Sequence, residues 1–182
     1  SVFAVGFASL SEVLISYFSN DNSGVGFFSL ALTLAMPLAL IPNSIGTSFF
    51  RNFASMEKIP TKLVINTILI STSALAISWI LVPFIVRIAF GDEFIGVISL
   101  FYIISIGLFF HGFGDFINRY LAARGFGKII RNCSIIIGVS ILILNICLIP
   151  IYKETGAAIA KLIAGCIYLI VLYYYYKIKI KN

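Results

Sequence analysis

Six long apolar runs alternate with short polar breaks along the 182 residues of the chain. A helix needs about 20 mostly apolar residues to cross the hydrocarbon core of a bilayer, and each run approaches or exceeds that length. The pattern therefore predicts an all-α integral membrane protein, with one six-helix lobe over residues 1–182. The predicted spans cover about residues 1–19, 25–49, 63–89, 95–117, 133–150 and 156–176.

Composition narrows the class further. Hydrophobic residues make up 60% of the chain and charged residues only 11%, whereas a soluble domain carries roughly 25% charged residues. The sequence Gly-Asp-Glu-Phe at 91–94 also occurs in the signature loop of cyclic-dinucleotide synthases, but such an enzyme needs a soluble domain and several metal-binding carboxylates. With seven acidic residues in all, we interpret 91–94 as a turn between the third and fourth spans, set by Gly91.

Basic residues predict the orientation of the spans. Ten Lys and Arg side chains fall in the breaks at 51–62 and 118–132 and in the tail at 177–182, and only Arg87 and Lys153 fall on the opposite side. Because cytoplasmic loops carry the excess of Lys and Arg, both chain ends are predicted in the cytoplasm. The net charge of +6 is then explained by topology, and no nucleic-acid partner is expected.

A polar stripe marks the first span. Ser9, Glu12, Ser16 and Ser19 are spaced three and four residues apart, which places them on one helical face. Glu12 would lie roughly 10 Å from the outer end of the helix, at 1.5 Å per residue. We interpret the stripe as the lining of a water-filled cavity. The alternative is that Glu12 pairs with a cation on another helix for packing alone.

Two prolines, Pro37 and Pro42, interrupt the second span. Each removes a backbone donor and is expected to kink the helix. Nearby Asn, Ser and Thr side chains at 43–48 could bond the freed carbonyls. Bent helices are common in alternating-access transporters, but proline is also common in ordinary membrane helices.

The fourth and sixth spans add titratable groups. His111 and Asp115 are four residues apart on one face, and Arg119 follows after four more. They form either a structural ladder at the inner mouth or a site that handles protons or contacts a headgroup. Lys161, five residues inside the last span, either snorkels outward or binds an anion in a cavity.

Nothing in the sequence predicts a metal, a cofactor or an enzyme. The cysteines Cys133, Cys147 and Cys166 lie within apolar runs without metal-ligand spacing, and the chain has one histidine. We interpret all three as packing residues. His111 and Asp115 have no nucleophile or metal partner in sight.

Four stretches resemble the C-terminal half of Wzx-like polysaccharide flippases, within the multidrug/oligosaccharidyl-lipid/polysaccharide (MATE-like) exporter superfamily. Residues 23–54 are similar to the family's loop and second helix, with an Ile-Pro and a basic-aromatic end. Residues 87–94 are similar to its short outer turn, and 119–132 to its inner loop with Leu-Ala-x-x-Gly before basic residues. Residues 144–164 carry the Asn-containing helix, the Ile-Pro exit and Gly-Ala-Ala-x-Ala. The resemblance covers essentially the whole chain.

The resemblance implies a protein of about twelve spans in two six-helix lobes, of which the N-terminal lobe is missing here. The full protein would flip oligosaccharides linked to undecaprenyl pyrophosphate across the bacterial plasma (inner) membrane, for O-antigen, capsule or a similar polymer. Alternating access around a central cavity would carry the cargo. Coupling to an H+ or Na+ gradient would suit Glu12, and no other cofactor is expected.

The resemblance leaves two questions open. The pyrophosphate partner is Lys161, Arg51, Arg119 or a residue of the missing lobe; Arg124 completes the basic group at the inner mouth. An acidic, serine-rich face in the first span differs from the cationic cavities of many relatives. It leaves as alternatives a cation-coupled multidrug exporter or a peptidoglycan-precursor flippase of the same superfamily. A membrane-embedded enzyme or an assembly subunit is the alternative from another class.

Overall fold

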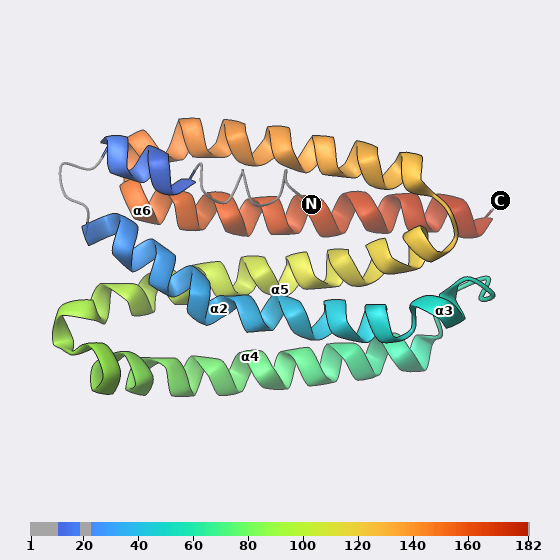
Figure 1. The fold of residues 1–182 in the computed structure, drawn as a ribbon, viewed down its shortest axis with the longest axis horizontal. Coiled ribbons are helices and arrows are strands. Elements are labelled where there is room, and N and C mark those ends of the chain that lie inside the picture. The colour runs from blue at the N-terminus through green and yellow to red at the C-terminus, as the bar shows by residue number, and fades with distance from the viewer. Residues whose placement is uncertain (1–10, 19–22, 182) are drawn as a thin grey trace.

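A computed structural model describes residues 11–18 and 23–181. All regular structure in this part of the chain is helical, which confirms the predicted all-α class (Figure 1). Residues 11–18 are helical. The elements that follow are α2 (Ser23–Ser48), α3 (Phe50–Phe53), α4 (Thr61–Phe90), the 3-10 turn η1 (Asp92–Phe94), α5 (Ile95–Ala123) and α6 (Gly127–Lys181).

Four of these helices, α2, α4, α5 and α6, are long and apolar enough to cross a membrane. The longest, α6, bends back on itself at Lys153, whose backbone is non-helical (φ 51°, ψ −129°). Figure 1 shows the result as two antiparallel arms. We call residues 127–152 the first arm and residues 154–181 the second arm. The polar break predicted between the last two apolar runs coincides with this reversal.

The helices extend further than the apolar runs predict. The break expected at 118–132 is mostly helical, because α5 continues to Ala123 and α6 begins at Gly127. Backbone hydrogen bonds within a helix do not require an apolar environment. Each helix can therefore continue through the basic residues that follow or precede its apolar run. Only three residues connect α5 to α6, and Gly125 adopts a positive φ of 79° there.

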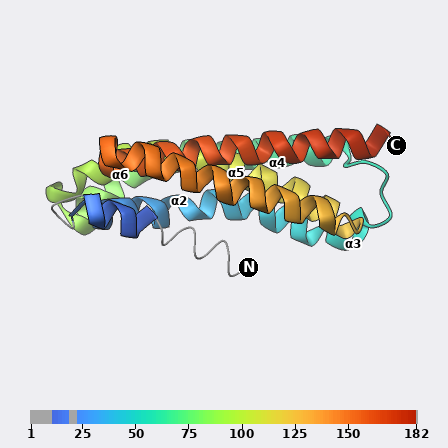
Figure 2. The same ribbon diagram turned by 90° about the horizontal axis from the view of Figure 1, so that it is seen from above.

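The bundle has two distinct ends. α3, the α5–α6 connection and the last turns of α6 lie at one end, and the Gly91 turn and the Lys153 reversal lie at the other (Figures 1 and 2). We call them the α3 end and the Gly91 end. The basic residues of the breaks at 51–62 and 118–132 therefore gather at the α3 end. This grouping brings together the side chains on which the predicted orientation rests.

The Gly91 turn is built as the sequence predicts. Gly91 ends α4 with φ 85° and ψ 175°, a conformation that is essentially restricted to glycine. Its N–H donates to the Arg87 carbonyl at 3.2 Å. Asp92 and Glu93 follow in η1, and both are exposed. The acidic residues thus occupy a tight, solvent-facing connection between α4 and α5.

Helix α5 lies between α2 and the second arm of α6, and it packs extensively on both. Helix α4 lies at the edge of the bundle and leaves many large apolar side chains exposed, among them Ile80, Phe84 and Ile88. An exposed apolar surface of this extent marks contact with a membrane or another protein. The α5 surface between α2 and α6 carries the polar side chains described below.

The two prolines of α2 leave it a single helix that changes direction part-way along its length (Figure 1). The hydroxyls of Thr47 and Ser48 donate to the carbonyls of Asn43 and Ser44. The carbonyls freed by Pro37 and Pro42 belong to residues 33 and 38, four positions earlier. These hydroxyls therefore do not bond the carbonyls that the prolines leave free.

Candidate functional site: a polar network on α5

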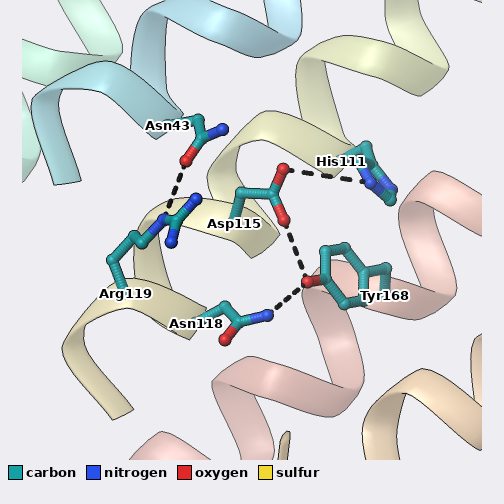
Figure 3. Close-up of polar contacts among 6 residues, drawn as sticks. All are labelled: Asn43, His111, Asp115, Asn118, Arg119 and Tyr168. Atoms are coloured by element: carbon teal, nitrogen blue, oxygen red, sulfur yellow. Dashed lines mark hydrogen bonds and ion pairs between the residues drawn. The ribbon is translucent and has the colours of Figure 1, made fainter. Parts of the chain in front are cut away.

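One side of α5 presents His111, Asp115, Asn118 and Arg119 within two helical turns. The second arm of α6 contributes Tyr168, and α2 contributes Asn43. Figure 3 shows the six side chains drawn together from these three helices. The contacts form two groups: His111, Asp115 and Asn118 meet at Tyr168, whereas Arg119 pairs with Asn43. Among the described residues, Arg119 makes no ion pair with Asp115, so the ladder expected from the sequence joins only His111 and Asp115.

Tyr168 is the centre of the network. Its hydroxyl donates to Asp115 Oδ1 at 3.0 Å and accepts from Asn118 Nδ2 at 2.7 Å (Figure 3). Its ring stacks on the His111 imidazole, with the centroids 4.5 Å apart. Gly114 makes this approach possible, because a Cβ there would collide with the Tyr168 ring. Buried at 6% exposure, Tyr168 fixes both the carboxylate and the imidazole.

His111 and Asp115 keep polar edges open. His111 Nε2 lies 4.0 Å from Asp115 Oδ2, and the side chains are 35% and 27% exposed. That distance is too long for a hydrogen bond. Within the described part of the chain, neither of these two atoms has a hydrogen-bond partner. The pair thus presents one acceptor oxygen and one imidazole nitrogen side by side.

Arg119 forms a separate polar pair beside the network, toward the α3 end. Its Nε donates to Asn43 Oδ1 at 3.0 Å, which connects α5 to α2 (Figure 3). Gly46 allows this contact, since a Cβ there would lie 3.2 Å from Arg119 Cγ. Arg119 is nevertheless exposed. A guanidinium held at Nε still has donors on its two terminal nitrogens, and these can face an anion.

Lys161 lies about one helical turn nearer the Gly91 end than His111 does. It is half-buried on the second arm, and a Cβ at Gly107 would lie 2.9 Å from its carbonyl oxygen. Gly107 precedes His111 by four residues, so this contact places the Lys161 backbone about one helical turn from His111. Cationic groups therefore flank the His111–Asp115 pair on both sides along the bundle.

The first-span stripe lies only partly in the described residues. Ser9 and Ser19 fall outside them, Glu12 is half-buried and Ser16 is exposed. The side of this helix that packs against the bundle carries Ser11 and Ile15, which precede Glu12 and Ser16 of the stripe by one residue each. Buried Ser11 accepts a 2.9 Å hydrogen bond from Asn145 Nδ2 of α6. No ion pair of Glu12 appears in this part of the chain, so its role stays a prediction.

Arg51 and Arg124 differ from Arg119. Arg124 Nη1 donates to the Met56 carbonyl at 2.6 Å and to the Tyr120 hydroxyl at 3.2 Å. Tyr120 in turn donates to the Glu57 carbonyl. Arg124 therefore holds the connection between α3 and α4 against α5. Arg51 is exposed on α3.

The structure contains three free cysteines, of which Cys133 is buried, Cys166 half-buried and Cys147 exposed. Among the described residues, no group of three His, Cys, Asp or Glu side chains could hold a metal ion. Cys133 packs in the apolar cluster around Tyr120 and Tyr168. A packing role thus describes this cysteine well.

Sequence reasoning missed Tyr168 and Asn118. Asn118 follows Asp115 by three residues, and Tyr168 follows Lys161 by seven. Both spacings return to the same helical face, so they could have placed each residue beside a polar neighbour. They could not have shown that these faces of α5 and α6 meet.

Comparison with known proteins adds one relative. No protein-family model matches the chain, and no solved structure matches it significantly. The chain is 29% identical over 162 residues to the capsular polysaccharide biosynthesis protein CapF of Staphylococcus aureus. The alignment covers 84% of this chain and 41% of CapF, so the chain spans less than half the length of this relative.

Proposed function

We propose that this chain is one lobe of a membrane transporter that flips lipid-linked oligosaccharides for a bacterial surface polysaccharide. The observation that carries the proposal is the similarity to a capsular polysaccharide biosynthesis protein along 84% of the chain. The long apolar helices agree with the proposal. A membrane-spanning protein of polysaccharide synthesis is suited to moving a lipid-linked oligosaccharide across the membrane. The proposed location is the bacterial plasma (inner) membrane.

The chemistry of the cargo fits the network on α5. A sugar headgroup with a pyrophosphate cannot enter hydrocarbon without large desolvation costs. It needs a polar surface, and the side chains of His111, Asp115 and Arg119 on one side of α5 are suited to contribute to one. The exposed apolar side chains of α4 are suited to contact lipid at the edge of the bundle where α4 lies.

The proposed partner is a second lobe of the same transporter. The chain spans 41% of the length of CapF, which leaves room in such a protein for an N-terminal lobe of similar size. The two lobes would face each other across a cavity that opens alternately to each side. A gradient of H+ or Na+ would drive the cycle, with Glu12 as the coupling carboxylate. Transport of this kind involves no covalent step by the protein.

Arg119 is the strongest candidate for the pyrophosphate within this chain. The residue is exposed, and Asn43 accepts a hydrogen bond from its Nε, which leaves the terminal nitrogens as donors. Arginine binds phosphate oxygens through paired donors. Arg124 already donates to the Met56 carbonyl, and Arg51 lies on the short helix α3 at the very end of the bundle. Lys161 is the second candidate, one turn beyond His111.

A second candidate function is a cation-coupled multidrug exporter of the same architecture. The half-buried carboxylates of Glu12 and Asp115 favour it, because carboxylates attract cationic compounds. A peptidoglycan-precursor flippase would share the pyrophosphate but carry another sugar.

The test uses the full-length gene in a strain that lacks its own flippase but has the cognate sugar genes. Surface polysaccharide is measured by gel for the wild type, Glu12→Gln and the control Leu69→Ile, whose side chain is 61% exposed on α4. We expect wild type and control to restore polymer and Glu12→Gln to fail at equal membrane levels. Polymer restored by Glu12→Gln would remove Glu12 from coupling, and failure of the wild type would favour the drug exporter.

A further inference from the structure

The open edge of the His111–Asp115 pair has a defined geometry. Asp115 Oδ1 is occupied by the Tyr168 hydroxyl, whereas Oδ2 faces His111 Nε2 across 4.0 Å. An oxygen atom placed about 2.8 Å from both atoms would see them at an angle of about 90°. A hydroxyl group can donate its proton in one of these directions and accept in the other. The gap thus fits one bridging hydroxyl oxygen.

We propose that His111 and Asp115 form a subsite for a sugar hydroxyl of the transported oligosaccharide. The hydroxyl donates to Asp115 Oδ2 and accepts from the Nε2–H of His111. The proposal rests on the proposed function and names the part of the cargo that this site recognises. The two side chains are 35% and 27% exposed, so a ligand can reach the pair.

Charge excludes other ligands from this position. The Asp115 carboxylate repels a phosphate, so the pyrophosphate does not bind there. A metal ion prefers several oxygen ligands, whereas Asp115 offers one free oxygen because the Tyr168 hydroxyl occupies the other. An uncharged hydroxyl meets neither obstacle. Hydrogen bonds to a charged carboxylate are also the stronger kind.

The spacing along α5 relates the subsite to the pyrophosphate. Arg119 follows Asp115 by four residues, which corresponds to about 6 Å along the helix axis. That is about the length of one sugar ring. With the pyrophosphate at Arg119, the hydroxyl subsite would therefore meet the sugar attached directly to it.

Tyr168 is the positioning residue of the subsite. It touches no ligand in this proposal, but its hydroxyl holds Oδ1 and its ring lies against the imidazole. Asn118 in turn fixes the Tyr168 hydroxyl. The carboxylate and the imidazole are therefore held before the ligand arrives, which reduces the entropy lost on binding.

The experiment measures binding to the purified full-length transporter in detergent. One probe is the lipid-linked oligosaccharide extracted from the strain that lacks the flippase, and the other is undecaprenyl pyrophosphate without sugar. The variants are Asp115→Asn, which keeps the shape of the side chain, and His111→Phe, which keeps the ring stacked on Tyr168. Asp92→Asn is the matched control, because Asp92 is exposed in the η1 turn.

We expect Asp115→Asn and His111→Phe each to bind the oligosaccharide probe about tenfold more weakly or worse, and Asp92→Asn to bind it as the wild type does. Binding of the sugar-free probe should change by less than about twofold, which also shows that the variants are folded. Equal weakening of both probes, or unchanged binding of the oligosaccharide, would overturn the hydroxyl subsite. If the wild type binds the sugar-free probe but not the oligosaccharide, the subsite also fails. If it binds neither, the proposed function itself fails.

Discussion

The two ends of the bundle are packed by different means. At the Gly91 end, the apolar core consists of aliphatic, alanine and phenylalanine side chains, including Phe28, Phe101 and Ile104. At the α3 end, the core includes Tyr120 and Tyr168, whose hydroxyls bond carbonyls, an amide and a carboxylate. The Gly91 end has separate polar pairs, Trp79 with Ser105 and Asn145 with Ser11, whereas each tyrosine hydroxyl at the α3 end joins several polar groups.

This difference explains where the candidate site lies. The network of His111, Asp115 and Asn118 belongs to the half of α5 that packs with the tyrosines. Toward the Gly91 end, the backbones of α5 and α6 meet at Gly107 and Gly165, which leaves no room for a side chain at either position. The network lies beyond this contact, in the half of the bundle where the Tyr168 ring packs against Gly114.

The largest effect is expected from filling the contact between α5 and α6. Gly165→Val would drive a side chain into the backbone at Gly107, and neither backbone can yield without separating the helices. We expect a loss of more than about 3 kcal/mol, beyond ordinary overpacking of a core. Fluorescence-detected gel filtration of the full-length protein would show little or no folded monomer.

Gly26→Ala is the matched control for this variant. Gly26 lies on the exposed side of α2, and a Cβ there meets nothing within 4 Å. It should give a wild-type profile. A normal profile for Gly165→Val as well would mean that the close contact between α5 and α6 is wrong.

A smaller effect is expected at Tyr168. Tyr168→Phe keeps the ring but removes the hydroxyl from Asp115 and Asn118, which costs about 1–2 kcal/mol of stability. The melting temperature should fall modestly. Binding of the oligosaccharide probe should weaken while binding of sugar-free undecaprenyl pyrophosphate does not. Tyr174→Phe, at a side chain 63% exposed, should change neither quantity, and equal behaviour of the two variants would remove Tyr168 from the network.

The smallest effect is expected at Arg124. Arg124→Ala removes the donor to the Met56 carbonyl and should loosen the connection between α3 and α4 without unfolding the helices. Limited trypsin digestion in detergent should then cut faster after Lys58, which is exposed in this connection. Arg131→Ala, at an exposed residue of α6, serves as the control. Equal cleavage rates in the two variants would show that Arg124 does not hold the connection.

Much of the fold follows from local patterns. Apolar run lengths predict the long helices, and Gly91 predicts the turn between α4 and α5 because its backbone conformation is local. The extension of α5 to Ala123 was not predicted, because the apolar pattern ends where the basic residues begin. The last residues of α6, to Lys181, extend the helix beyond the predicted apolar run for the same reason.

The site was predictable only within single helices. His111 and Asp115 share a face of α5, and helical spacing is enough to show it. The contribution of Tyr168 depends on how closely α6 approaches α5 at Gly114, and that approach is a property of the packed bundle. The Asn145–Ser11 bond, between residues 134 positions apart, has the same origin.

The most direct test of the central claim is a translocation assay with the purified full-length protein. The protein is reconstituted into liposomes that contain the lipid-linked oligosaccharide, with and without an imposed pH or Na+ gradient. Periodate added outside then oxidises only the sugars that face outward. We predict that the sugars protected from periodate become oxidised faster in liposomes with the wild type than in protein-free liposomes. Liposomes with Asp115→Asn, the variant expected to bind the oligosaccharide weakly, should also be slower than the wild type. An equally protected pool in all three, with folded protein in the membrane, would contradict the account.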